Sequence, residues 1–439
     1  MDEIYKTLLA EWEQRKLPAT IARDIGLADY AVLSPKKIVV VSGFRRTGKT
    51  FLLFHLIASL EKKKVVYINF EDERIPVTTA FLTGLLPAIK EICGQIDYVF
   101  LDEVHVISQW SKWLRRVYDT ESIRFFVTGS SSKMSSREIP TELRGRFLDI
   151  CVFPLNFREF LRFRNASLAD KTLDDKAQLG RMLHEFLIYG GLPEVVLMPE
   201  EKKIELLRGY FNTVIRRDII ERFHIRSEEN LKALLRLLLG STRYTISKLY
   251  NSLKSLQYEV GKSTLQTFIG YIESSYFMYS VPVMSPKVKA QMQWPRKLYF
   301  VDTGFISQLS GKFSKDMGRL YENAVFLELR RRQKSDQDIF YWKNQQHEEV
   351  DFVIKQGLSI YQLIQVCYDV DDYDTKKREI KALYKASNEL RCRNLIIITE
   401  GKEGTETYYG KKIHYVPLWE WLLSGAGQSA LSMPVNRQS

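Results

Sequence analysis

The feature that most constrains this chain is an apolar run followed at once by a glycine-bounded loop and then by an apolar segment of helical length. Residues 38–42 read Ile-Val-Val-Val-Ser, a β-branched run that predicts a strand buried on both faces of a parallel sheet. Phe51 opens the apolar segment that follows, which predicts a helix. The loop between them fits the pattern GxxxxGK[ST] and consists of Gly43, Phe44, Arg45, Arg46, Thr47, Gly48, Lys49 and Thr50.

A loop in this setting predicts a site for a nucleoside triphosphate. Its backbone N–H groups wrap phosphates, and the start of the following helix favours negative charge. We expect Lys49 to reach the β- and γ-phosphates and the hydroxyl of Thr50 to bind Mg²⁺. The sequence therefore predicts ATP and Mg²⁺ as cofactors, with nucleotide contacts from Gly43 through Phe51.

Two further strands predict the groups that act on this nucleotide. Residues 98–101 form an apolar run that ends in Asp102 and Glu103. We expect Asp102 to hold Mg²⁺, usually through water, and Glu103 to act as the general base for the attacking water. A third strand over residues 123–127 ends in a hydroxyl-rich run, from which we expect Ser130 to contact the γ-phosphate.

Together these motifs resemble the AAA+ branch of the P-loop ATPases. More narrowly, the pair Arg45-Arg46 and the runs at 69–72, 143–146 and 154–160 resemble the archaeal and bacterial ATPases of the "archaeal ATPase" family. The resemblance implies that an arginine beside Gly145 approaches a phosphate, either in its own subunit or across a subunit boundary. That role falls to Arg146, with Arg144 second and Arg217 as another candidate. It leaves open whether the protein is a monomer or a homo-oligomer.

At 439 residues the chain exceeds the size of one hydrophobic core, so we expect several domains of α/β class. Helix-period apolar positions after residue 176, broken by a Gly-Gly-Leu-Pro run at 190–193, predict a helical lid. We expect an AAA+-like ATPase core over residues 1–175, the helical lid over 176–228, a winged helix over 229–300, a restriction-endonuclease-like α/β domain over 301–424 and a flexible tail over 425–439.

The winged helix follows from a change of pattern in the middle of the chain. Helical periodicity over 231–239, 246–256 and 262–274 precedes an extended segment at 276–284. The third helix would be the recognition helix, since that element contacts DNA in this class. The alternative is a module that serves only for packing.

Basic and polar residues sit where such a module would meet DNA. Lys262 and Ser263 would open the third helix. Four more side chains would lie on or after the wing and reach phosphates: Lys287, Lys289, Arg296 and Lys297.

The last domain resembles the PD-(D/E)xK nuclease-like fold. A helix over 318–332 precedes strands at 339–342, 349–354 and 363–367. The resemblance implies that Glu322 and Asp351 hold Mg²⁺ beside a scissile phosphate. However, the expected acid-x-Lys is Gln365-Val366-Cys367, in which a neutral amide is a weak ligand and a thiol has no permanent charge. Glu322 and Asp351 are thus either a crippled metal site or buried polar residues hydrogen-bonded for structure.

The overall charge bears on partners and location. A formal net charge of +12 attracts polyanions, of which nucleic acid is the commonest inside cells. The four cysteines form no CxxC pair, so neither a disulfide framework nor a zinc site is expected. Because no run of about 18 apolar residues occurs, we expect a cytoplasmic protein without a membrane partner.

These features favour an ATPase that controls the binding or remodelling of duplex or branched DNA, in repair, recombination or mobile-element biology. One alternative is a nucleotide-gated switch of the signalling type, whose C-terminal domains bind protein partners. Another is an ATP-regulated DNA nuclease, which the departures at Gln365 and Cys367 disfavour.

Overall fold

The computed structural model describes residues 2–129, 143, 145–166, 173–310, 316–370 and 372–424, which fall into two compact units. The first unit is Met1–Pro154 with Ser274–Tyr276, and the second is Leu155–Glu273 with Phe277–Ser439. The first unit ends at Pro154, not at the predicted boundary of 175, because the next helix packs with elements of the second. The predicted tail, 425–439, lies outside the described residues.

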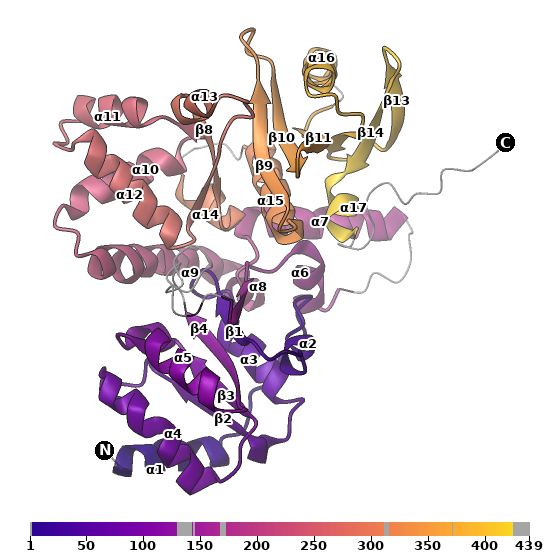
Figure 1. The fold of residues 1–439 in the computed structure, drawn as a ribbon. Helices are drawn as coiled ribbons and strands as arrows, with labels where there is room; N and C mark the ends of the chain where they lie inside the picture. Colours follow the sequence, from indigo (N-terminus) through magenta and orange to yellow (C-terminus); the bar gives the residue numbers. More distant parts are fainter. Residues whose placement is uncertain are drawn as a thin grey trace. The chain divides into compact units, whose positions relative to one another are not determined.

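A five-stranded parallel sheet forms the centre of the first unit (Figure 1). The strands lie in the order β2-β3-β4-β1-β5, so that β1 is flanked by β4 and β5. Their bounds are Ile38–Ser42 (β1), Val65–Asn69 (β2), Tyr98–Asp102 (β3), Arg124–Gly129 (β4) and Phe147–Cys151 (β5). The strands predicted near 38–42, 98–102 and 123–127 are confirmed.

Helices bury both faces of this sheet, as the apolar β1 run predicts. Alternate residues of a strand point to opposite faces, and Val40 accordingly packs in a different core cluster from Val39 and Val41. The first cluster includes side chains of α1 (Asp2–Gln14), α4 (Thr79–Cys93) and α5 (Trp110–Thr120), and the second includes those of α2 (Ala28–Ala31) and α3 (Lys49–Ile57). Short 3₁₀ turns, η1 (Lys62–Lys64) and η2 (Val104–Val106), precede β2 and follow β3.

Helices open the second unit. A capping box starts the first of them, since Asn156 accepts from the N–H of Glu159 while the Glu159 carboxylate accepts from the N–H of Asn156. That helix, α6, contacts α7, α8 and α17, and the region predicted as a lid is helical. The elements are α6 (Phe157–Phe163), α7 (Leu173–Tyr189), α8 (Pro193–Leu197), α9 (Glu200–Thr213) and the π-helix η5 (Val214–Glu221).

Residues 228–300 form what we call the three-helix module. The predicted helices at 231–239, 246–256 and 262–274 are confirmed, and three short antiparallel strands join them in the order β6-β8-β7. A short helix absent from the prediction, α13, lies between β7 and β8. The bounds are α10 (Glu228–Leu239), β6 (Arg243–Tyr244), α11 (Ile246–Ser255), α12 (Lys262–Ser274), β7 (Met278–Val281), α13 (Val288–Gln293) and β8 (Arg296–Phe300).

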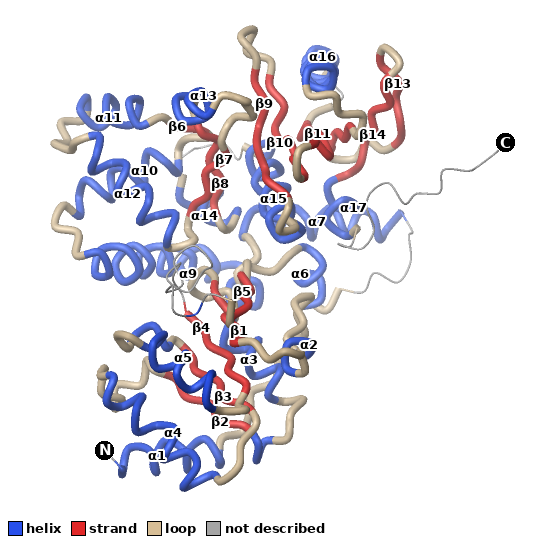
Figure 2. The backbone as a smooth tube through the Cα atoms, in the orientation of Figure 1, coloured by secondary structure: helices blue, strands red, loops and turns tan. Residues whose placement is uncertain are grey.

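Residues 317–423 form what we call the six-stranded domain, which follows α14 (Thr303–Leu309). Its sheet has the order β13-β14-β12-β11-β10-β9, antiparallel from β9 to β11 and parallel from β11 through β12 to β14. Figure 2 shows the helix α16 beside these strands. The predicted helix and strands are confirmed. The bounds are α15 (Met317–Arg332), β9 (Gln337–Lys343), β10 (Glu349–Gln356), β11 (Ser359–Cys367), α16 (Tyr373–Glu389), β12 (Leu395–Thr399), β13 (Gly404–Tyr408), β14 (Lys411–Pro417) and α17 (Leu418–Leu423).

All four cysteines are free thiols, as the sequence predicts. Among the described helices, none combines the length and the apolar character needed to cross a bilayer.

Candidate functional site

The loop after β1 has a backbone that only glycine permits at its first position. Gly43 has φ of 138°, and a Cβ there would lie 2.3 Å from the carbonyl oxygen of Val152. Gly48, with φ of 88°, is the residue before α3. The glycine spacing thus bends the chain from the buried end of β1 into the first turn of a helix, where N–H groups are available to an anion.

Lys49 lies folded over this loop. Its Nζ donates to the carbonyl oxygens of Gly43 and Phe44, each at 3.1 Å, and only 6% of the residue is exposed. The hydroxyl of Thr47 also donates to Phe44, at 2.9 Å. The loop therefore carries a buried positive charge together with backbone donors, the combination that attracts a polyphosphate.

The carboxylate of Asp102 accepts three side-chain hydrogen bonds at the end of β3. Thr50 and Tyr67 each donate to Oδ2 at 2.7 Å, and Thr128 donates to Oδ1. Burial raises the pKa of Asp102, while the hydrogen bonds from Thr128, Thr50 and Tyr67 oppose that shift. Thr50 and Asp102 thus bring hydroxyl and carboxylate oxygens together, and oxygen is the ligand type that Mg²⁺ takes in proteins.

Glu103 follows Asp102 with a left-handed backbone, φ 52°. Its N–H donates to the hydroxyl of Thr128 at 2.9 Å, and its Oε2 lies 3.2 Å from Nδ1 of His105. Burial raises the pKa of Glu103, but His105, Lys49 and Arg45 outweigh it and hold the value at about 2. The side chain is therefore an ionised carboxylate near the phosphate loop.

Three residues around this site were not predicted. Tyr67 of β2 donates to Asp102, and His105 faces Glu103. Arg23 donates to the carbonyl oxygens of Thr47 at 2.9 Å and Phe153 at 3.0 Å, which ties the N-terminal segment to the phosphate loop. Thr128, the first residue of the predicted hydroxyl-rich run, donates to Asp102 from β4.

Other predicted nucleotide contacts lie at the rim of the loop. Arg45 pairs with Glu71 at 3.4 Å and is half-buried. Arg46 is exposed, and 53% of Phe51 is exposed. Ser130 and Arg144 lie outside the described residues.

Arg146 lies beside the N-terminal end of β1, whereas the phosphate loop follows the C-terminal end of that strand. Its carbonyl oxygen accepts from the N–H of Ile38, the first residue of β1, whereas the loop follows the last residue, Ser42. Its guanidinium pairs with Asp119, with Nε 2.9 Å from Oδ1. The length of β1, roughly 13 Å, separates Arg146 from its own loop. The expectation of a phosphate contact within the subunit is therefore wrong; a contact across subunits stays a prediction.

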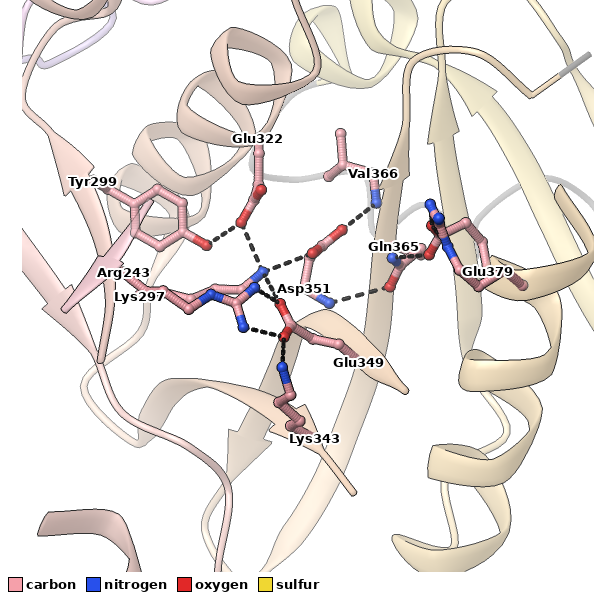
Figure 3. Close-up of polar contacts among 11 residues, drawn as sticks. Arg243, Lys297, Tyr299, Glu322, Lys343, Glu349, Asp351, Gln365, Val366 and Glu379 are labelled. Carbon is pink, nitrogen blue, oxygen red and sulfur yellow. Dashed lines mark hydrogen bonds and ion pairs between the residues drawn. The ribbon is translucent and has the colours of Figure 1, made fainter. Parts of the chain in front are cut away.

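A buried charge cluster lies in the second unit, between the three-helix module and the six-stranded domain (Figure 3). Nζ of Lys297, on β8, lies 2.7 Å from Asp351, 2.8 Å from Glu322 and 2.9 Å from Glu349. The Lys297 side chain is only 4% exposed. The expectation that Lys297 reaches DNA phosphates is thus wrong, because its buried amine forms ion pairs with three carboxylates.

Further polar groups surround these carboxylates (Figure 3). The hydroxyl of Tyr299 donates to Glu322 at 2.6 Å, and Arg243 donates two bonds to Glu349 at 2.7 and 2.8 Å. Lys343 lies 3.3 Å from Glu349. The predicted pair Glu322 and Asp351 is therefore brought together, but around an ammonium group.

Asp351 and Gln365 are also bound to the backbone. Oδ2 of Asp351 accepts from the N–H of Val366 at 2.9 Å, and Oε1 of Gln365 accepts from the N–H of Asp351 at 3.1 Å. The amide nitrogen of Gln365 donates to Glu379. The pKa of Lys297 is raised well above its usual value, because the surrounding carboxylates outweigh burial. Burial raises the pKa of Asp351, opposed by Lys297.

A cleft of about 720 Å³ opens beside the cluster. One wall is α16, and the other is the end of the β9–β10 hairpin. Bases and acids alternate along it, and Glu348 pairs with both Lys381 and Lys385. The described residues contain no group of three or more His, Cys, Asp or Glu side chains arranged to hold a metal.

Other predicted DNA contacts are exposed on the three-helix module. Lys262 and Ser263 are exposed at the start of α12, with Nζ of Lys262 3.4 Å from the hydroxyl of Ser247. Lys287 and Lys289 are exposed at the start of α13.

Comparison with known proteins places the chain among relatives. It is 37% identical over 430 residues to the uncharacterized protein MJ1544 of Methanocaldococcus jannaschii, covering 95% of each chain. The protein belongs to the MJ1544 family. An uncharacterized protein of Haemophilus influenzae is 26% identical over 348 residues, covering 76% of this chain and 83% of its own. The similarity to MJ1544 thus extends over both units.

Three family models match successive parts of this chain, which is a relative of MJ1544. Residues 35–161 match an AAA domain, and residues 180–316 and 317–421 match two domains of unknown function, DUF8612 and DUF4143. The first unit is therefore an AAA-type P-loop ATPase domain, with a mixed α/β fold built on a parallel sheet.

Solved structures give partial likenesses. The Walker-type ATPase PABY2304 of Pyrococcus abyssi has 13% identity and a TM-score of 0.46, covering 67% of this chain and 99% of its own. ORC1 of Aeropyrum pernix, solved with DNA, has 14% identity and a TM-score of 0.31, and the match covers 69% of this chain and 91% of ORC1. The RuvB branch migration motor of Thermotoga maritima has 16% identity and a TM-score of 0.28, and the match covers 64% of this chain and 88% of RuvB.

Proposed function

We propose that this protein hydrolyses ATP with Mg²⁺ and uses the nucleotide state to control its binding to, or remodelling of, duplex or branched DNA. The hydrolytic part rests on the first unit. In it Lys49 would bind the β- and γ-phosphates, Thr50 and Asp102 would hold the metal ion, and Glu103 would polarise the attacking water. The ion would neutralise charge on the phosphate oxygens.

The geometry of Glu103 supports its role as the base. Its backbone is anchored through Thr128, whose hydroxyl also binds Asp102, so the two carboxylates are linked through one side chain. Its low pKa keeps it ionised at any physiological pH, so its negative charge can polarise the attacking water. The neighbouring Lys49 would offset the charge when the nucleotide is bound.

The observation that carries the DNA proposal is the order of elements in the three-helix module. Helix, strand, two helices and strand, then the short helix α13 and a last strand, with the sheet order β6-β8-β7, resemble a winged helix apart from the insertion of α13 between β7 and β8. In that class the helix corresponding to α12 enters the major groove. Lys262, Ser263, Gln266 and Thr267 form an exposed face of α12, which carries no acidic residue in its first turn.

The basic residues after β7 fit the same surface. Lys287 and Lys289 are exposed on the segment between β7 and β8, where a wing would lie, and would bind phosphates without reading sequence. With a net charge of +12, the chain also has the long-range attraction that a polyanion requires.

A second candidate function, a nucleotide-gated switch that binds a protein, is favoured by α13. Val288 and Met292 are 68% and 74% exposed, and they lie one turn apart on that helix. Salt separates the two functions. Binding through many phosphates weakens steeply with added salt, whereas an apolar contact with a protein responds less.

The third candidate, a nuclease, is disfavoured by the ammonium of Lys297 between Glu322 and Asp351.

The test is ATP hydrolysis by the wild type and Glu103→Gln, each with no DNA and with duplex, forked and four-way DNA. Stimulation by one of these DNAs that is lost in Glu103→Gln supports a DNA-linked ATPase. Glu103-dependent hydrolysis that no DNA alters sinks the DNA part and favours the protein switch. Hydrolysis that survives Glu103→Gln contradicts the assignment of the base.

A further inference from the structure

The carboxylates of Glu322, Glu349 and Asp351 converge on one point in the second unit (Figure 3). They come from α15 and β10, and each places an oxygen within 2.9 Å of the Nζ of Lys297. Carboxylate oxygens are the ligands that a divalent cation takes in proteins, although the described residues contain no group already arranged to hold one. Here the centre is a nitrogen that arrives from β8, an element of the other module.

The residues present do not fit a metal ion at this point. Gln365, which stands where the family resemblance implies an acid, turns its oxygen to the N–H of Asp351 and its nitrogen to Glu379. Cys367 is buried, and its thiol donates to the carbonyl oxygen of Asp369 at 3.4 Å. Both side chains are therefore engaged with partners other than the ammonium of Lys297.

The charges of the cluster are already balanced. Three carboxylates meet three cations, namely Lys297, Arg243 and Lys343, all within salt-bridge distance of Glu349. A divalent ion added to this set would bring an excess of positive charge into a buried place, which is costly.

We propose that Lys297 is an internal cation that takes the position of a divalent metal. Its ammonium holds Glu322, Glu349 and Asp351 together, closes the centre to metal ions and fastens the three-helix module to the six-stranded domain. Metal-dependent cleavage of nucleic acid is absent from this centre as a result. The proposal rests on neither the ATPase nor the DNA role.

The prediction is that removing the amine opens a metal site. In Lys297→Ala the three carboxylates remain, the space of the side chain is vacated and the repulsion among the acids favours a divalent ion. Mn²⁺ binding to the full-length chain without nucleotide is measured by electron paramagnetic resonance. We expect one more Mn²⁺ bound per chain in Lys297→Ala than in the wild type.

Two variants serve as controls. Lys343→Ala removes a cation that contacts the same Glu349 but leaves the ammonium of Lys297 in place, so it should bind no additional Mn²⁺. Lys297→Ala combined with Asp351→Asn should lose the additional ion. Mn²⁺ at the phosphate loop is common to all variants and cancels in the comparison.

Several results overturn the proposal. One is wild-type Mn²⁺ binding that Asp351→Asn abolishes, since the centre would then be open. Another is a folded Lys297→Ala that binds no more Mn²⁺ than the wild type. If Lys297→Ala folds only poorly, refolding with Mn²⁺ decides: recovery that the double variant does not share supports the proposal, and failure to recover contradicts it.

Discussion

Nδ1 of His105 lies 3.2 Å from Oε2 of Glu103, just beyond the end of β3. Glu103 is held at the other end by the bond from its own N–H to Thr128. Nδ1 of His105 is buried and faces this carboxylate. Thr128 thus fixes the backbone of Glu103, the proposed general base, and His105 contacts its carboxylate.

Replacing His105 should impair hydrolysis without abolishing nucleotide binding. We expect Lys49-dependent ATP affinity to persist in His105→Ala, while kcat falls by roughly tenfold, equivalent to about 1.4 kcal/mol of transition-state stabilisation. The imidazole also lowers the pKa of Glu103. Its loss should raise that pKa from about 2, so the acid limb of the kcat profile moves to higher pH. The measurement is kcat and KM across pH 4 to 8.

The matched variant for this test is His105→Gln, which keeps a side chain of similar reach and should recover part of kcat but not the charge effect on the acid limb. A kcat in His105→Ala equal to that of the wild type, with an unmoved pH profile, would mean that His105 only fills space.

Arg146→Ala should leave the ATPase rate of an isolated subunit within about twofold of the wild type, because removing a side chain that does not touch the transition state changes the barrier little. The reason is its place at the far edge of the sheet, where it pairs with Asp119. Turnover is measured over a range of protein concentrations. A large loss of activity that appears only at concentrations where the protein self-associates would instead show Arg146 acting across subunits.

Part of this fold could be predicted, because β1, β3, β4, the strands β9 to β11 and the helices α10 to α12 have a local apolar pattern. The strands β5, β12, β13 and β14 and the helix α13 were not predicted. The phosphate loop and the carboxylates after β3 are likewise local patterns. Tyr67 could not be predicted as a partner of Asp102, because that depends on β2 lying beside β3. Lys297 was misassigned for the same reason: a lysine in sequence is exposed by default, and only its tertiary neighbours bury it.

The carboxyl of Asp302 should make stability depend on pH. It accepts from the N–H of Gly191 at 2.7 Å and of Gly304 at 2.8 Å, and it fills the space beside Gly190, which has no room for a Cβ. Burial raises its pKa to about 6, despite these bonds. Since an unfolded aspartate ionises near pH 3.9, the folded chain binds more protons between these values, and its free energy of unfolding falls as pH rises from about 4 to 6.

The matched variant is Asp302→Asn, which has no ionisable group and loses one of the two acceptors. Wild-type stability minus variant stability should fall by roughly 2 kcal/mol between pH 4 and pH 7, most of the value of a shift of about two pKa units. Urea unfolding followed by tryptophan fluorescence gives this difference. A difference that stays constant with pH, or rises, would mean that Asp302 is ionised in the folded chain throughout.

Lys297→Met should destabilise the second unit by about 3–5 kcal/mol in the absence of added metal, because it leaves buried carboxylates without their shared cation. The exposed Lys287→Met, in the same module, should cost under about 0.5 kcal/mol. Urea unfolding of both variants at pH 7 checks the contrast. Equal effects of the two substitutions would mean that water reaches the Glu322 and Asp351 carboxylates and screens them.

The DNA proposal makes a quantitative prediction about salt. If Lys262, Lys287 and Lys289 each contact a phosphate, the triple alanine variant should bind duplex more weakly, and the slope of log Kd against log salt should fall by about three. Counterion release is proportional to the number of phosphates neutralised, so the slope counts contacts in a way that affinity alone does not.

The control is alanine at three exposed lysines outside the module, Lys6, Lys63 and Lys412, which should leave the slope unchanged. Equal slopes for the two triple variants would show that these three lysines do not contact the DNA. A steep slope that both share would put the contacts on another surface of the chain, and a shallow slope in the wild type would favour a protein partner bound through the exposed side chains of α13.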